Sequence, residues 1–177
     1  SGLLFVIIMI TAIWFSEFSL LILLQIIGFF AIREYFKLSF KLGFHPLIIP
    51  GIISGILILC LSFLVAAGHF PTAFLMLNII PFLLLPVINL FYHPERIIHS
   101  FSSTFSGLIY VYLPLSIIPF ISFYRLEYNY EILIGIFIIL WTYDSFAYLS
   151  GVLFGRHKIY QKVSPKKSWE GLLGGLL

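Results

Sequence analysis

Long apolar runs with almost no charged residues constrain this chain more than any other feature of its sequence. With 61% hydrophobic and 10% charged residues, the chain has too little polar surface for a soluble domain of 177 residues. A helix needs about 20 apolar residues to cross the hydrocarbon core of a bilayer. Four runs meet that length: 46–67, 70–92, 104–124 and 130–154. Because backbone polar groups in lipid must bond within their own segment, these runs predict an all-α, polytopic transmembrane helical bundle in a lipid bilayer.

Two shorter apolar runs, 2–15 and 18–32, precede these spans and are separated by Ser16 and Glu17. Each is too short for a full span, so together they predict a short N-terminal helical hairpin. Charged residues then alternate with aromatic and aliphatic ones as far as Lys41, which is typical of a segment on the membrane surface or of a flank that stops a span. The expected parts of one membrane domain, 1–177, are the hairpin with its surface segment (1–43), four spans (44–154), a basic loop (155–170) and the start of another helix (171–177).

The basic residues fall unevenly on the two sides of the predicted spans. If the hairpin and every later span each cross once, all of the 10 lysines and arginines except Arg125 lie on one side. The positive-inside rule makes that side cytoplasmic. Because these charges lie in short loops between apolar runs, they report topology and give no reason to expect a nucleic-acid partner.

Asp144 lies inside the last full run, shortly after the uninterrupted apolar stretch 132–141. A charged side chain at mid-bilayer costs about 2.5 to 3.5 kcal/mol even on the lenient insertion scales, so such a residue usually faces a protein interior, a partner or a cation. On a helix, Ala147, Tyr148 and Gly151 share its face, which leaves little bulk around the carboxylate. The structural alternative is that Asp144 pairs with a lysine or a hydroxyl inside the bundle.

The chain becomes strongly basic after Gly155, and no acid follows until Glu170. Within this stretch, residues 164–171 have the sequence S-P-K-K-S-W-E-G, which combines two hydroxyls, two ammonium groups and a helix start marked by Ser168. Free N–H groups at a helix N-terminus and lysine point charges both suit phosphate oxygens. The composition therefore favours anion binding, with ordinary positive-inside charges as the alternative. The basic side chains are Arg156, His157, Lys158, Lys162, Lys166 and Lys167.

Three ordered blocks resemble the phosphatidate cytidylyltransferase, or CDP-diacylglycerol synthase, family. They are D-S-F-A-Y from Asp144, F-G-R-H-K from Phe154 and S-P-K-K-S-W-E-G-x-x-G-G from Ser164. The resemblance implies an integral enzyme of the bacterial inner membrane with a cytoplasmic active face. Such an enzyme condenses CTP with phosphatidate, gives CDP-diacylglycerol and pyrophosphate, and uses Mg²⁺.

The resemblance is sharp from Asp144 onward and implies roles for the polar residues of the three blocks. Asp144 is the expected Mg²⁺ ligand, although Mg²⁺ takes one or two carboxylates with phosphates and water, so a second acid is needed. The glycine pairs 151/155 and 171/175 are expected to serve helix packing. The residues expected to act on phosphate are Lys166 and Lys167 as catalytic groups, with Ser164, Ser168, Arg156 and Lys158 in substrate binding.

Members of the family continue past the position of Leu177 into further helices with more metal and nucleotide ligands. The chain is therefore expected to be a fragment, cut at both ends and inactive alone, and a homodimer stays open. Two other classes stay open as well: a CTP-dependent lipid kinase of the polyprenol type, and a membrane transporter or scaffold without catalysis.

Overall fold

The computed structural model describes residues 2–92, 95, 97–160 and 164–176. It is mostly helical, which confirms the predicted all-α class, and it divides into two compact units, Ser1–Tyr130 and Glu131–Leu177. In the described residues, five helical segments are long and apolar enough to cross a membrane: Glu17–Lys41, Ile48–Ala66, Thr72–Tyr92, Ile97–Ser122 and Tyr130–Phe154.

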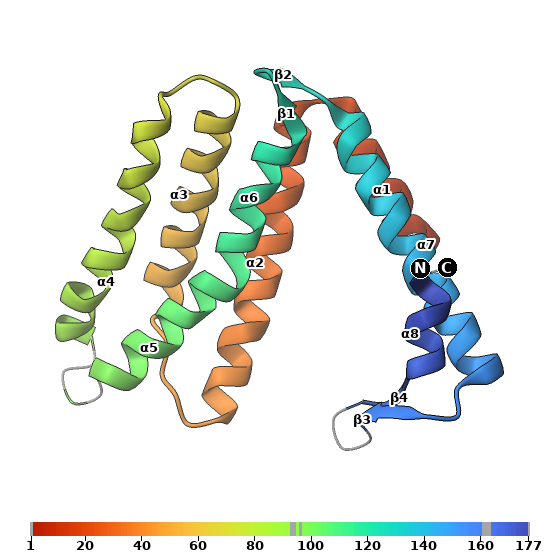
Figure 1. The fold of residues 1–177 in the computed structure, drawn as a ribbon. Helices are drawn as coiled ribbons and strands as arrows, with labels where there is room; N and C mark the ends of the chain where they lie inside the picture. The colour runs from red at the N-terminus through yellow and green to blue at the C-terminus, as the bar shows by residue number, and fades with distance from the viewer. Residues whose placement is uncertain (1, 93–94, 96, 161–163, 177) are drawn as a thin grey trace. The chain divides into compact units, whose positions relative to one another are not determined.

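The first unit is a bundle of helices with a small β-hairpin at one end (Figure 1). Helix α3 contacts α2, α4, α5 and α6, and therefore lies at the centre of the bundle. The elements of this unit are α1 (Gly2–Phe15), α2 (Glu17–Lys41), α3 (Ile48–Ala66), the 3₁₀ helix η1 (Thr72–Asn78), α4 (Ile79–Tyr92), α5 (Ile97–Gly107), the π-helix η3 (Leu108–Tyr112), α6 (Leu113–Ser122), β1 (Phe123–Tyr124) and β2 (Glu127–Tyr128).

The N-terminal hairpin is present, but its second helix is longer than the sequence analysis predicts. Ser16 begins α2 with a capping box, in which its hydroxyl accepts from the backbone N–H of Ser19 at 3.1 Å. The helix then continues to Lys41, because buried Ile32 and Phe36 keep the spacing of its inner face. The expected surface segment is therefore the last part of a candidate span.

A buried tyrosine ring joins the central helices of this unit. Tyr112 ends the π-helix η3, where the N–H of Leu113 bonds to the carbonyl of Leu108, and its side chain is fully buried. A Cβ atom on Gly28 of α2 would lie 2.8 Å from the ring, and one on Gly55 of α3 would overlap it. Because both positions lack a Cβ, α2, α3 and η3 can meet around one aromatic side chain.

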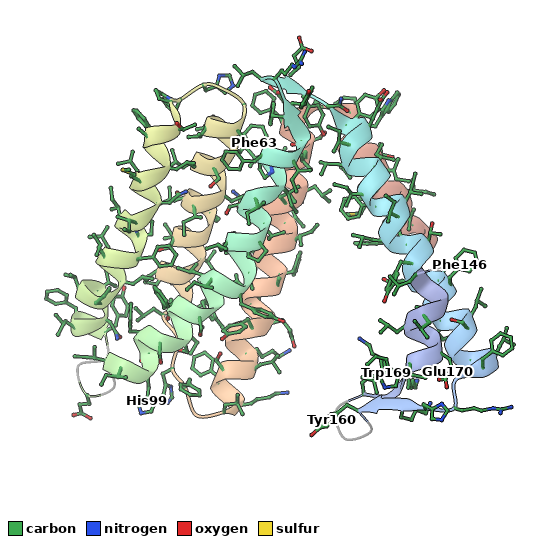
Figure 2. The ribbon with its side chains drawn as sticks, in the orientation of Figure 1. Phe63, His99, Phe146, Tyr160, Trp169 and Glu170 are labelled. Carbon is green, nitrogen blue, oxygen red and sulfur yellow. The ribbon has the colours of Figure 1, made fainter. Side chains whose placement is uncertain are left out.

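Phe36 of α2 makes a second contact of this kind. Cβ atoms on Gly51 and Gly107 would lie 2.7 and 2.9 Å from its ring, so α3 and α5 approach α2 closely there. Elsewhere in the unit, Phe63 is fully buried and its ring centroid lies 5.6 Å from that of Phe123 (Figure 2). Aromatic rings therefore fill the bundle at several levels.

The second unit contains α7 (Tyr130–Phe154) apart from its first residue, then β3 (Lys158–Tyr160), β4 (Ser164–Ser168) and α8 (Trp169–Leu176). Helix α8 runs beside α7, and the two strands form an antiparallel hairpin at the end of both helices (Figure 1). The basic stretch of the sequence is thus a β-hairpin rather than an irregular loop.

We expect Gly55→Ala to lower the free energy of unfolding by about 1 to 3 kcal/mol, because the new methyl group would overlap the buried Tyr112 ring. The measurement is unfolding in detergent by a denaturant titration. Gly135→Ala is the matched control, since a Cβ atom there meets nothing within 4 Å. Equal stability of the two alanine variants would contradict the packing described for Tyr112.

Candidate functional site

Glycine contacts hold α8 against α7 and so position the hairpin between them. A Cβ atom on Gly171 would lie 2.8 Å from the carbonyl oxygen of Ala147 and 3.2 Å from the Cα of Gly151. One on Gly175 would lie 2.9 Å from the Tyr143 ring. These contacts confirm the predicted packing role of the pair 171/175, because a side chain at either position would push α8 away from α7, whereas a Cβ atom on Gly151 would make only ordinary contacts. The hairpin therefore starts and ends on a close helix pair.

A bulge interrupts the pairing of β3 with β4. The cross-strand pairs Lys158–Ser168 and Tyr160–Ser164 leave a single residue of β3 opposite three residues of β4, 165–167. The extra residues of a bulge are not held by the regular ladder, and bulges turn side chains in new directions next to functional sites. Both candidate catalytic lysines lie inside this bulge.

Four lysine and arginine side chains of the described part of the hairpin are exposed and have no acidic partner among the described residues. Lys166 and Lys167 are exposed on β4, and Arg156 and Lys158 are exposed around β3. Among the described residues, no carboxylate lies within ion-pair distance of these four cations. Four positive charges thus lie close together along the chain without neutralisation, which suits an anionic ligand.

Glu170 is the acid that fixes the hairpin to the helix pair. Its carboxylate accepts hydrogen bonds from the backbone N–H groups of Arg156 and His157, each at 3.2 Å, and lies 2.6 Å from Nδ1 of His157. The backbone N–H of Trp169 donates to the carbonyl of His157 at 2.9 Å. The chain that leaves α7 is therefore bonded to the first turn of α8.

The charge of Glu170 is favoured by these bonds. The hydrogen bond with the His157 side chain, followed by a bond to the backbone of Glu170 itself, lowers the pKa of this carboxyl from 4.5 to about 2. An anion with three N–H donors is a fixed element of the structure rather than a free charge. Figure 2 shows Glu170 and Trp169 at the start of α8.

The two serines of the motif differ in their surroundings. Ser168 is 3% exposed, and its hydroxyl accepts from the N–H of Gly171 at 3.2 Å, which makes it a cap of α8. Ser164 is half-buried at the other end of β4. The described bond gives Ser168 a role in positioning the helix, while its predicted contact with phosphate stays a prediction.

An open pocket of about 740 Å³ lies where α7 gives way to the hairpin and α8 begins. We call it the α7–α8 pocket. Neither lysine of the bulge lines it, although both belong to the same hairpin. Its walls are Arg156, His157, Lys158, Trp169, Glu170 and Leu173.

Asp144 lies apart from these groups. Its side chain is exposed on α7, eleven residues before Gly155, which corresponds to roughly 16 Å along the axis at about 1.5 Å per residue. The described residues contain no group of three His, Cys, Asp or Glu side chains that could hold a metal ion. The structure thus brings the predicted phosphate-binding residues into one hairpin and leaves Asp144 deeper along the helix. Lys162 lies outside the described residues.

The sequence analysis counted His157 only among the basic side chains of the stretch and assigned no role to Glu170. The available signal was the position of Glu170, an acid directly after a long basic stretch and in the first turn of a predicted helix. The bond that makes it important joins residues 13 positions apart, so it depends on how the hairpin folds back. Local pattern alone does not reveal such a contact.

Comparison with known proteins agrees with the family resemblance drawn from the sequence. The phosphatidate cytidylyltransferase of Haemophilus influenzae is 54% identical over 46 residues, which is 26% of this chain and 16% of the relative. The enzyme of the same name from Rickettsia felis is 39% identical over 71 residues, 40% of this chain and 30% of the relative. That of Thermotoga maritima is 36% identical over 84 residues, 48% of this chain and 30% of the relative.

These matches thus span less than a third of the length of each relative. The match to a family is broader. The model described as "Cytidylyltransferase family" matches residues 1–177, so the resemblance predicted from the sequence is confirmed and the chain belongs to the cytidylyltransferase family.

Proposed function

We propose that the protein containing this chain is a phosphatidate cytidylyltransferase that makes CDP-diacylglycerol for phospholipid biosynthesis. A phosphate oxygen of phosphatidate attacks the α-phosphorus of CTP, and the bond from that phosphorus to the β-phosphate oxygen breaks. Pyrophosphate leaves with the electron pair of the broken bond. The observation that carries the proposal is the bulged hairpin at the end of a candidate membrane span, with four cations that have no acidic partner in the part of the chain that the structure describes.

Both substrates are anions, so the main task of the protein is to gather and orient negative charge. Lys166 and Lys167 project from the bulge, and an ammonium group held there stabilises the charge that develops as pyrophosphate leaves. Ser164, Arg156 and Lys158 supply hydrogen bonds to phosphate oxygens. Ser168 and Glu170 hold the hairpin in place through the contacts described above.

Asp144 has the hard oxygen donor that Mg²⁺ prefers, so we assign it as one ligand, directly or through water. When bound, Mg²⁺ neutralises phosphate charge and helps orient the reacting groups. Phosphate oxygens, water and further acids complete a magnesium shell around a single carboxylate. Because Asp144 lies roughly 16 Å along α7 from Gly155, we assign its carboxylate to the metal ion and not to an ion pair with the hairpin lysines.

The reaction is proposed to face the cytoplasm of a bacterial cell, across its inner membrane. The five candidate spans support an integral membrane protein. The basic residues of the hairpin belong to the side that the positive-inside rule assigns to the cytoplasm, where CTP is available. A homodimer stays a prediction.

In the complete protein, we expect Lys167→Ala to reduce turnover by about 10²- to 10³-fold, the loss typical of removing one preorganised group that stabilises transition-state charge. The measurement is incorporation of label from CTP into phosphatidate in detergent. Lys37→Ala, which removes an exposed lysine of α2, is the matched control, and Lys162→Ala is expected to matter less. Equal rates for Lys167→Ala and wild type would contradict a catalytic role and would leave this lysine as an ordinary positive-inside charge.

The same assay tests the proposed function itself if CTP is labelled once in the cytosine and once in the γ-phosphate. Cytosine label in the lipid product identifies the transferase. Transfer of the γ-phosphate alone identifies a lipid kinase, and absence of both labels from lipid favours a transporter or scaffold. Either of the last two results would overturn the proposal.

We expect Asp144→Asn to abolish magnesium-dependent turnover of the complete protein, because the amide keeps the shape of the side chain but loses the charge that binds the ion. Tyr148→Phe, an exposed position one turn further along α7, is the control for a local change of polarity. Circular dichroism reports whether the variants keep their helices. Normal activity with an unchanged magnesium requirement would leave Asp144 with a structural role.

The carboxyl carbon of Glu170 should titrate with a midpoint near pH 2 in a ¹³C NMR experiment, compared with 4.5 for an unperturbed glutamate. Because the pKa of Glu170 is lowered in the folded protein, ionisation of this carboxyl stabilises the hairpin at every pH above about 4.5. This contribution is lost as the pH falls from about 4.5 to about 2. At neutral pH, Glu170→Gln should therefore speed hydrogen exchange of the Arg156 and His157 amides. A midpoint near 4.5 would show that the carboxylate does not close the hairpin.

A further inference from the structure

We propose that the α7–α8 pocket is a headgroup site that binds the phosphate monoester of the lipid substrate, separately from the lysines of the bulge. This inference rests on the proposed function, because it assigns one of that reaction's two anions to a place. A reaction that joins two anionic substrates needs two cationic groups close together. The hairpin supplies both, since Arg156 and Lys158 line the pocket while the bulge lysines do not.

The position of the pocket along α7 favours a ligand that is anchored in the membrane. The candidate span ends at Phe154, so Arg156 and Lys158 begin immediately beyond it, at the depth of lipid headgroups. Trp169 and Tyr160 are more than half exposed at the same end of the unit (Figure 2), and such aromatic side chains prefer the membrane interface.

The walls of the pocket divide into a charged part and an apolar part. Arg156 and Lys158 supply N–H donors, and an arginine can bind two phosphate oxygens at once. Leu173, one turn into α8, supplies an apolar surface on the side that leads back along α7. A lipid whose phosphate is followed by acyl chains matches both parts, whereas a triphosphate matches the charged part alone.

The Glu170 carboxylate does not prevent the pocket from binding an anion, because its oxygens are already bonded within the hairpin. Its carboxylate already accepts from the backbone of Arg156 and His157 and lies 2.6 Å from Nδ1 of the His157 ring. Because a phosphate monoester carries up to two charges with three terminal oxygens, it gains more from the cations of Arg156 and Lys158 than a phosphodiester does.

The test follows binding at the single tryptophan of the pocket. In the complete protein, every tryptophan other than Trp169 is replaced by Phe, Trp14 and Trp141 included, so that the remaining fluorescence comes from Trp169. The reconstituted protein is titrated, without Mg²⁺, with dihexanoyl phosphatidic acid, dihexanoyl phosphatidylcholine, inorganic phosphate and CTP. We expect dihexanoyl phosphatidic acid to bind at least tenfold more tightly than phosphatidylcholine or inorganic phosphate, and Arg156→Gln with Lys158→Gln to weaken it at least tenfold.

Arg33→Gln with Lys37→Gln is the matched control, because it removes the same charges from exposed positions of α2. Native mass spectrometry counts bound lipid on the same variants, which keeps the test decisive if Trp169 emission does not change. Equal binding of the monoester and diester lipids, or a pocket variant that loses CTP instead of lipid, would overturn the inference. Selective lipid binding without any cytidylyl transfer would keep the pocket assignment and refute the proposed function.

Discussion

Close approach of helices at glycine is the constraint on which both units depend. In a bilayer, apolar side chains gain little by leaving lipid for a helix interface, so dense packing must hold the helices together. The first unit places aromatic rings, Tyr112 and Phe36, against glycines of neighbouring helices. The second unit places glycines of α7 and α8 against each other, which brings the hairpin between them to a fixed place.

The fold could be predicted from sequence where one physical rule dominates. Run length and apolar composition are sufficient to predict helical spans, because lipid leaves the backbone few alternatives. The extent of α2 was missed because Arg33 and Lys37 end the apolar run, although Ile32, Phe36 and Ser39 continue the helical spacing of the buried face. Periodicity was therefore a better guide than the length of the run at this position.

The candidate site could be predicted from sequence less fully than the fold. Composition indicated that Lys166 and Lys167 belong to an anion site, but their place in a bulge depends on which residues of the two strands pair. Glu170 was missed because its partners come from the other side of the hairpin. The separation of Asp144 from the lysines, by contrast, follows from the rise of an α-helix per residue. It could therefore have been predicted from the number of residues between Asp144 and Gly155.

The bulge has a consequence for how this motif can vary. Three residues of β4 occupy the space opposite one residue of β3, while the pairs on both sides stay in register. Removing or adding one residue between Ser164 and Ser168 would change the size of the bulge or the pairing beside it, and would therefore shift either the lysines or the cap of α8. Substitutions in this segment alter one side chain at a time, whereas insertions and deletions would move several residues of the motif together, so the length of the segment is itself part of the structure.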